Sequence, residues 1–155
     1  MRINQYKTML DEDRKNVLVK EASSNYPAIQ SLKCPQNIIS MMEVVFNVSD
    51  LAEEHAWLLA MNNACHLIGV FELSHGSVTT TIMGSREIFV RCCLCGASGF
   101  VLVHNHPCGT MTPSKEDQEV TEKIRNAGDL MGIKLLDHII VGNYAYYSFK
   151  EEGKI

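Results

Sequence analysis

A short apolar run that ends in a pair of histidines constrains the fold of this chain most strongly. Residues 100–104 read FVLVH, and a nearly continuous apolar strand is typical of a sheet that is covered on both faces. Pro107 and Gly109 follow directly after the histidines. Proline cannot donate a hydrogen bond to a neighbouring strand, so the strand is expected to end at the second histidine. The chain therefore needs a sheet with helices on it, and the histidines lie where this strand ends.

Hydrophobic periodicity predicts the remaining elements. Helices are expected over residues 35–47, 85–95 and 114–131, where apolar residues recur every three or four positions. The NNAC segment after residue 61 indicates a turn that joins an antiparallel pair. Strands are expected over residues 55–61, 66–73, 77–83, 100–104, 134–142 and 144–150. This order predicts an α/β (α+β) domain with a mixed, mostly antiparallel sheet packed between helices.

Local signals predict where the helices begin and end and which faces they bury. Pro35 stands near the start of the first helix and Asn47 near its end. Ser85 is expected to cap the second helix, and Gly96 or Gly99 to end it. The expected buried stripes are Ile38, Met41, Met42, Val45 and Phe46 in the first helix, Ile88, Cys92 and Cys95 in the second, and Val120, Ile124, Ala127 and Met131 in the third.

Length and composition favour one domain of residues 34–155 preceded by a polar arm of residues 1–33. The arm has one apolar patch, VLVKEA, that is expected to form a short strand. The sequence leaves open whether the arm packs on the domain or on a second copy of the chain, as in a homodimer.

Charge and hydropathy narrow the classes of partner. The formal charge of −4 gives no basic surface for nonspecific binding to nucleic acid. No apolar run approaches the ~20 residues of a membrane span, and the N-terminus lacks the apolar core of a signal peptide. The expected location is therefore the cytoplasm, with the six cysteines as free thiols.

The stretch HNHPCGTMTPSKED, residues 104–117, has the pattern of a metal site. In an extended chain His104 and His106 project to the same side, roughly 7 Å apart at the backbone. Asp117, early in the next helix, is the best candidate for a third ligand, and Ser114 lies three residues before it on the same helix face.

Alternative interpretations of this stretch stay open at the level of sequence. SKED is also an acceptable capping box, with Ser114 as the N-cap and Asp117 three residues later. Thr112 before Pro113 is a competing cap that would leave Ser114 and Asp117 free. Two histidines at the end of a strand are often ordinary polar residues. The combination of all these features favours the metal site.

The spacing of His104, His106, Ser114 and Asp117 resembles the JAMM signature of JAB/MPN-type zinc metalloproteins. The segments SREIF, HNHPCGTMTPSKED and GIKLLDHIIVG together resemble the RadC family, over roughly residues 36 to 150. The resemblance implies a JAB/MPN (cytidine-deaminase-like) sandwich in which His104, His106 and Asp117 hold Zn²⁺ with a water in the fourth position.

The resemblance also implies roles for residues around the metal. The residues alone leave Glu53, Glu54, Glu72 and Glu87 as candidates for the general base. The family pattern places an acid before the strand that follows the first helix, which selects Glu54, with Glu53 second. Ser114 would donate a hydrogen bond to the substrate oxygen as negative charge develops. Asp137 and His138 are expected to orient the ligands or to support the fold.

The function implied is that of a zinc-dependent metallopeptidase or isopeptidase, which hydrolyses an amide bond of a peptide or protein with zinc-activated water. An alternative is a non-catalytic accessory module linked to DNA repair or mobile DNA. A third interpretation takes the two histidines and one carboxylate as an iron site. Fuller members of the RadC family carry an N-terminal helix-hairpin-helix DNA-binding region, for which about 35 residues leave no room, so direct DNA binding is less expected.

Overall fold

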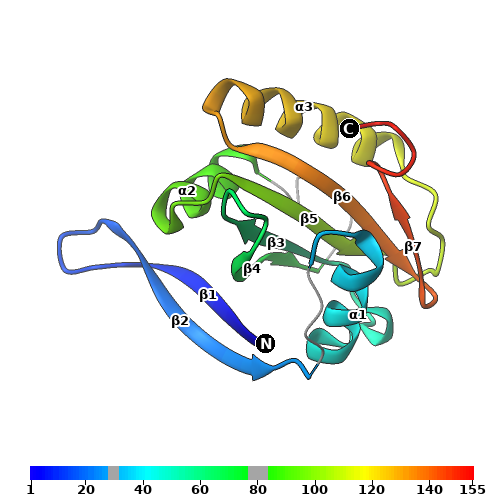
Figure 1. Ribbon diagram of the computed structural model, residues 1–155, viewed down its shortest axis with the longest axis horizontal. Coiled ribbons are helices and arrows are strands. Elements are labelled where there is room, and N and C mark those ends of the chain that lie inside the picture. Colours follow the sequence, from blue (N-terminus) through cyan, green and yellow to red (C-terminus); the bar gives the residue numbers. More distant parts are fainter. Residues whose placement is uncertain (28–31, 77–83) are drawn as a thin grey trace.

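The computed structural model describes residues 1–27, 32–76 and 84–155. The strand expected over residues 77–83 lies outside these described residues. The described part forms seven strands, three α-helices and one short 3-10 helix (Figure 1). In chain order the elements are β1 (Arg2–Leu10), β2 (Asn16–Asn25), α1 (Pro35–Phe46), η1 (Val48–Asp50), β3 (His55–Met61), β4 (Leu67–His75), α2 (Ser85–Cys95), β5 (Gly99–Asn105), α3 (Lys115–Met131), β6 (Lys134–Gly142) and β7 (Ala145–Ser148).

All seven strands belong to one sheet, in the order β2-β1-β4-β3-β5-β6-β7. The β1–β4 and β5–β6 pairs are parallel and the other neighbours are antiparallel. The predicted mixed, mostly antiparallel sheet is therefore confirmed. The predicted turn between β3 and β4 is also present, where the Asn62 amide donates to the His66 carbonyl at 3.0 Å.

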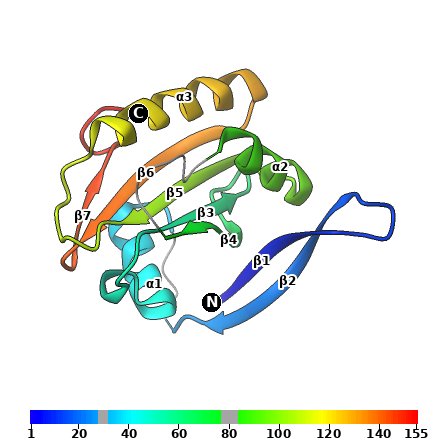
Figure 2. The same ribbon diagram turned by 180° about the vertical axis from the view of Figure 1, so that it is seen from behind.

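Helices cover both faces of the sheet (Figures 1 and 2). On one face α1 contributes Ile38 and Met42 to a core that also contains Trp57 and Val103. On the other face α2 and α3 pack over a second core around Phe100. Every residue of β5 is buried, which explains its nearly continuous apolar sequence. The predicted sandwich of a sheet between helices is confirmed.

The first helix agrees with its sequence signals. Pro35 begins α1, and Asn47 ends it in the left-handed conformation with φ 50°. A left-handed residue at this position closes a helix because its amide returns to a carbonyl of the last turn. Here the Asn47 amide donates to the Glu43 carbonyl at 3.0 Å. Of the expected stripe, Ile38, Met41 and Met42 are buried, whereas Val45 and Phe46 are partly buried.

Two details of the other helices were predicted wrongly. Gly84, with extended backbone angles, holds the cap position of α2, and Ser85 is already helical, a conformation that a capping residue does not adopt. In α3 Met131 is 51% exposed, so it does not belong to the core stripe. The buried residues of this helix are Asp117, Thr121, Ile124 and Gly128. Polar side chains that face the site replace part of the expected apolar stripe.

The N-terminal arm is more ordered than its polar sequence suggested. It forms a long antiparallel hairpin of β1 and β2 that extends the sheet at one edge (Figure 1). Ile3 and Tyr26 are buried in the core beneath α1. At the opposite edge β7 is shorter than expected, because Phe149 and Lys150 already belong to a turn. In the described part of the chain, no helix combines the length and the apolar character needed to span a bilayer.

Candidate metal centre

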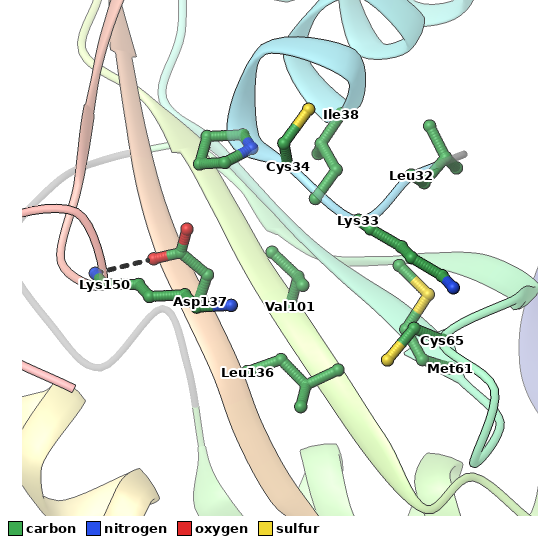
Figure 3. A pocket seen from close by; sticks show the side chains of 11 residues that line it. Leu32, Lys33, Cys34, Ile38, Met61, Cys65, Val101, Leu136, Asp137 and Lys150 are labelled. Carbon is green, nitrogen blue, oxygen red and sulfur yellow. Dashed lines mark hydrogen bonds between the residues drawn. The ribbon is translucent and has the colours of Figure 1, made fainter. Parts of the chain in front are cut away.

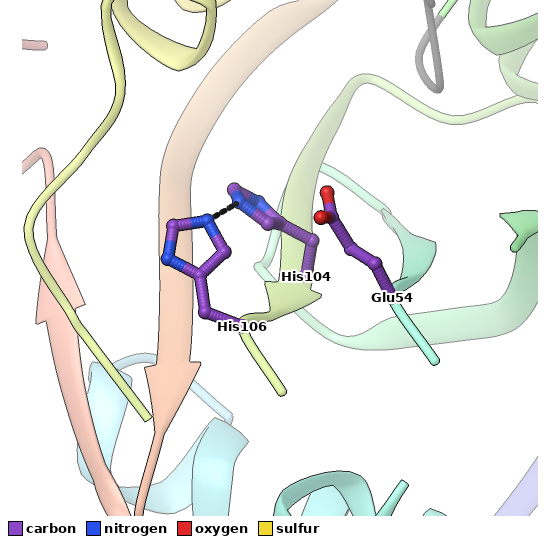
Figure 4. Close-up of side chains that lie close together, drawn as sticks. All are labelled: Glu54, His104 and His106. Atoms are coloured by element: carbon purple, nitrogen blue, oxygen red, sulfur yellow. Dashed lines mark hydrogen bonds between the residues drawn. The ribbon is translucent and has the colours of Figure 1, made fainter. Parts of the chain in front are cut away.

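The end of β5 places the two histidines of the HNH stretch against each other. The His106 amide donates to the Val141 carbonyl of β6 at 2.8 Å, so the chain stays extended through this residue. Both rings therefore project to the same side, and their Nε2 atoms lie 3.0 Å apart (Figure 4). His104 is 1% exposed. The expected two-histidine arrangement at the strand end is present.

Hydrogen bonds define the protonation of His106. Its Nδ1 lies 2.9 Å from the Thr110 carbonyl oxygen. A carbonyl oxygen can only accept a hydrogen bond, so Nδ1 must carry a proton. In the neutral ring the Nε2 atom then has a free lone pair that points at His104.

A longer chain of hydrogen bonds defines the protonation of His104. The Thr121 hydroxyl donates to the Asp117 backbone carbonyl at 2.5 Å, and its oxygen lies 2.6 Å from His138 Nδ1. A hydroxyl has one proton, so His138 Nδ1 is the donor in the second bond. His138 is fully buried, and burial lowers its pKa well below the usual value, so the ring is neutral. Its Nε2 therefore accepts from His104 Nδ1 at 2.9 Å.

When both rings are neutral, these assignments leave two unprotonated nitrogens facing each other across 3.0 Å. Facing lone pairs repel unless a proton or a cation lies between them. Two ligands at about 2.0–2.1 Å from one tetrahedral zinc ion are about 3.3 Å apart, close to the observed separation. The spacing of the pair thus fits two ligands of one metal ion.

Asp117 lies beside the two histidines, in the first turn of α3. Its Oδ1 lies 3.3 Å from His104 Nε2 and its Oδ2 lies 3.6 Å from His106 Nε2. Burial raises the pKa of this carboxyl, but its interactions with the His104 and His106 rings outweigh burial and hold the pKa far below its usual range. Asp117 is therefore an anion at neutral pH, as a metal ligand must be.

Ser114 is the N-cap of α3, and it forms the capping box with Asp117. Its amide and its hydroxyl donate to Asp117 Oδ2 at 2.8 and 2.6 Å, while its Oγ accepts from the Asp117 amide at 3.0 Å. The competing cap at Thr112 is not used. The capping box leaves Asp117 available to the histidines, because the box holds Oδ2 while Oδ1 is directed at His104.

Glu54 reaches the histidines from the segment before β3. It is 7% exposed, whereas the neighbouring Glu53 is exposed, so the structure brings the first of the two candidate acids to the site. Glu54, His104 and His106 offer ligand atoms within 4.8 Å of one another, a group that could hold a metal ion (Figure 4). Burial raises the pKa of Glu54, and the two histidines only partly oppose this shift.

Asp137 lies on the other face of the sheet from His138 and does not reach the histidine pair. Its Oδ2 accepts from the Ser148 hydroxyl at 2.6 Å and its Oδ1 accepts from the Lys150 amide at 3.0 Å. It borders a small pocket beneath α1 that Cys34 and Cys65 also line (Figure 3). These bonds tie β6 to β7 and to the following turn, so Asp137 has the structural role that was one of its two expected roles.

Three contributions to the site were not foreseen from the sequence. Thr121 lies four residues after Asp117 on the same helix face, and this spacing could have identified it. Asn105 points to the face opposite its histidine neighbours, as strand alternation requires. The Thr110 carbonyl is a backbone group, and no side-chain pattern indicates it.

Comparisons with known proteins place the chain among related sequences. A family model described as the RadC-like JAB domain matches residues 32–154. The chain is 40% identical over 106 residues to a UPF0758 protein of Flavobacterium johnsoniae, covering 68% of this chain and 46% of that protein. It is 38% identical over 123 residues to a UPF0758 protein of Caldanaerobacter subterraneus subsp. tengcongensis, covering 79% of this chain and 52% of that protein. It is 37% identical over 105 residues to a UPF0758 protein of Thermotoga maritima, covering 68% of this chain and 47% of that protein.

The chain spans about half the length of these curated relatives. The family match covers all the residues that form the site, from Glu54 to His138. A RadC-like relationship was predicted from the three sequence segments, and the comparisons confirm it. The chain belongs to the family of RadC-like JAB domains.

Proposed function

We propose that this chain is a zinc-dependent hydrolase that cleaves an amide bond of a peptide or protein. The observation that supports this function is the pair of histidine Nε2 atoms 3.0 Å apart, close to an ionised carboxylate, Asp117, and to a buried one, Glu54. We place the protein in the cytoplasm, because its six cysteines are free thiols and free thiols persist in reducing compartments.

His104, His106 and Asp117 are the three residues that we propose as ligands. The pKa values of Asp117 and Glu54 are shifted in opposite directions, which suits one of them to bind a metal ion and the other to act as a general base. Asp117 has a strongly lowered pKa and lies within 3.6 Å of both histidines, which suits a metal ligand. A zinc ion held there would lower the pKa of a bound water and polarise the carbonyl of the substrate.

Glu54 is the proposed general base. Its raised pKa brings it closer to neutral pH, where a carboxylate transfers protons most effectively. Its carboxylate takes a proton from the attacking water as the new carbon–oxygen bond forms. It then delivers this proton to the amide nitrogen as the carbon–nitrogen bond breaks, which returns Glu54 to its starting state.

Ser114 is proposed to act at the substrate oxygen. Its hydroxyl donates to Asp117 in the structure, so it must rotate away from this carboxylate before it can donate to a substrate. The Ser114 amide would still hold Asp117 Oδ2 through its bond of 2.8 Å. Rotation of the hydroxyl therefore leaves Asp117 in place while negative charge develops on the substrate.

Glu54→Gln tests this function most sharply. Zinc-loaded protein is incubated with a mixture of unfolded proteins, and mass spectrometry measures the new peptide termini. Glutamine keeps the shape of the side chain but cannot take the proton. We expect cleavage to fall by about 10²- to 10⁴-fold while one zinc ion remains bound. Glu53→Gln is the matched control, because this neighbour is exposed and should leave cleavage unchanged.

The same experiment has two results that contradict the proposal. Cleavage at the wild-type rate by Glu54→Gln would remove this residue from the chemistry. No cleavage by the zinc-loaded wild type, across the protein mixture and isopeptide-linked conjugates, would instead favour a binding module in which the metal organises a surface.

A further inference from the structure

The side chain of Asn105 bridges the metal-binding strand and the segment that carries Glu54. Asn105 lies between the two histidines in sequence, but its side chain projects to the opposite face of β5. It is 2% exposed. Its Oδ1 accepts from the His55 amide at 2.7 Å, and its Nδ2 donates to the Glu53 carbonyl at 3.0 Å. One amide group thus binds the backbone on both sides of Glu54.

This bridge begins where the backbone ladder between the strands ends. The last pair of the β3–β5 ladder is Ala56 with His104. Beyond this pair, the side-chain amide group of Asn105 supplies the donor and the acceptor that the backbone of a further ladder pair would have supplied. On the other side of the same segment, the Gly76 amide donates to the Glu54 carbonyl at 3.0 Å. The backbone of residues 53–55 is therefore held from both neighbouring strands.

The chemistry of this bridge selects asparagine. The group must donate to a carbonyl oxygen and accept from an amide at the same time. Aspartate in its ionised form has no donor for the Glu53 carbonyl. Leucine has a similar shape but neither polar atom, and it would leave the Glu53 carbonyl and the His55 amide without a partner in a buried place.

We propose that Asn105 is a positioning residue that fixes Glu54 relative to His104 and His106. The catalytic consequence of this inference rests on the proposed function of Glu54 as the base, but the mechanical link does not. Asn105 contacts neither Glu54 nor a ligand side chain through its own amide. It sets where the Glu54 carboxylate lies by fixing the backbone that carries it.

The mechanical link is tested by amide hydrogen exchange of His55 in Asn105→Leu and Asn105→Asp. The leucine variant loses the acceptor, so the His55 amide should exchange at least about 10-fold faster than in the wild type. The aspartate variant keeps the acceptor and should keep the protection. Ser148→Ala is the matched control, since it removes another buried polar bond, to Asp137, far from Glu54. Unchanged His55 exchange in Asn105→Leu would overturn the proposal.

The catalytic consequence is tested by kinetics on the zinc-loaded protein. Both Asn105 variants should lose about 10- to 100-fold in kcat, with KM and zinc affinity within about threefold of wild type. In a Glu54→Gln background the same substitutions should cause no further loss, because they act through Glu54. Wild-type kcat in both variants, or an equal additional loss in the double variants, would contradict the positioning role. If the leucine variant does not fold, kcat of the aspartate variant decides the question.

Failure of the proposed function is distinguishable from failure of this inference. If the wild-type protein cleaves nothing, the hydrolase proposal fails and His55 exchange still decides whether Asn105 holds the segment. If the wild type cleaves but Asn105→Leu alters zinc affinity as much as kcat, Asn105 supports the ligands in general and its specific role toward Glu54 is wrong.

Discussion

Neighbouring groups with fixed hydrogen-bonding roles determine which ring nitrogen of each histidine at the site carries a proton. The Thr110 carbonyl can only accept, and it sets the protonation of His106. The Thr121 hydroxyl gives its proton to the Asp117 carbonyl and so sets His138, which in turn sets His104. This series of hydrogen bonds begins at the backbone carbonyl of Asp117 and ends at His104. It therefore links two of the proposed ligands through Thr121 and His138, which are not themselves proposed as ligands.

Thr121→Val should weaken metal binding although Thr121 is not a ligand. Valine has the shape of threonine but no hydroxyl, so His138 Nδ1 loses its acceptor and the His104 ring is no longer held in one form. We expect zinc affinity, measured by competition with a chelator, to fall by about 10- to 100-fold. Thr121→Ser keeps the hydroxyl and should stay within about threefold of wild type. Equal affinities in the two variants would show that this chain of hydrogen bonds does not prepare the site.

The metal-free protein should become less stable as the pH rises above about 6.5. Without a metal ion, a second proton on His106 would lie on Nε2, 3.6 Å from the Asp117 carboxylate. This interaction raises the pKa of His106, and burial only partly opposes the shift. A histidine with a raised pKa stabilises the fold fully below its unfolded value of about 6.5 and loses this contribution as the pH rises through the folded pKa. Urea unfolding should show the free energy falling with pH, by at most about 1.4 kcal/mol per unit for one proton.

His106→Gln is the control for this dependence on pH. Its free energy of unfolding should change less over the same range, because the titrating group is gone. If the free energy of unfolding of the wild type stays constant or rises above pH 6.5, the pKa of His106 is not raised in the folded, metal-free protein.

At the residue scale the sequence predicted the side chains that meet at the candidate site and, in His138, one residue behind them, but not Thr121 or the Thr110 carbonyl. The spacing of His104, His106 and Asp117 is local, and strand and helix periods convert it directly into a shared direction. Thr121 and His138 meet through a contact between α3 and β6. Such a contact depends on packing between separate elements, which a pattern within one element does not encode.

The loop between β5 and α3 positions His106 by a close backbone approach to β6. A Cβ atom at Gly142, the last residue of β6, would lie 2.9 Å from the carbonyl oxygens of Gly109 and Thr110. The Thr110 carbonyl is the partner of His106 Nδ1. The absence of a side chain at Gly142 therefore allows the Thr110 carbonyl to approach His106 and to accept the proton of its Nδ1 atom.

Gly142→Ala should displace this loop and lower zinc affinity. The new methyl group needs space that two backbone carbonyls occupy, so we also expect a loss of about 1–3 kcal/mol in stability. Gly128→Ala is the matched control. Its Cβ would lie 2.6 Å from the Ile133 carbonyl, away from the loop, so it should destabilise the fold without changing zinc affinity. Equal zinc affinities for the two variants would contradict the role of the loop.

At the element scale the sequence predicted the elements with strong apolar periodicity. The first helix, the buried strands around FVLVH and the turn at NNAC all follow from such local patterns. The short strand expected at VLVKEA is part of β2. The pairing with β1 was missed because most residues of the hairpin are exposed or partly buried, with Ile3 the one buried residue in these two strands. The cap of α2 was misplaced by one residue, since glycine and serine are both acceptable there and only backbone angles distinguish them.

At the scale of the whole molecule, the sheet brings together segments that are far apart in the chain. Glu54 directly precedes β3, the two histidines flank the last residue of β5, and Asp117 lies in the first turn of α3. The pairing of β3 with β5 brings Glu54 and the histidines to one end of the sheet. The N-terminal hairpin lies at the β2 edge of the sheet, at the other side from β7 (Figure 2). Whether this edge pairs with a second copy, as in a homodimer, stays a prediction.

We propose that one metal ion is held by His104, His106 and Asp117 while Glu54 stays unbound beside it. A crystal structure of the zinc-loaded protein, with anomalous diffraction at the zinc edge, measures this directly. We predict one ion about 2.0–2.2 Å from both Nε2 atoms and from an Asp117 oxygen, with the Glu54 carboxylate facing the fourth position through a water. An ion bound by Glu54 in place of Asp117, or no ion between the two histidines, would contradict this arrangement.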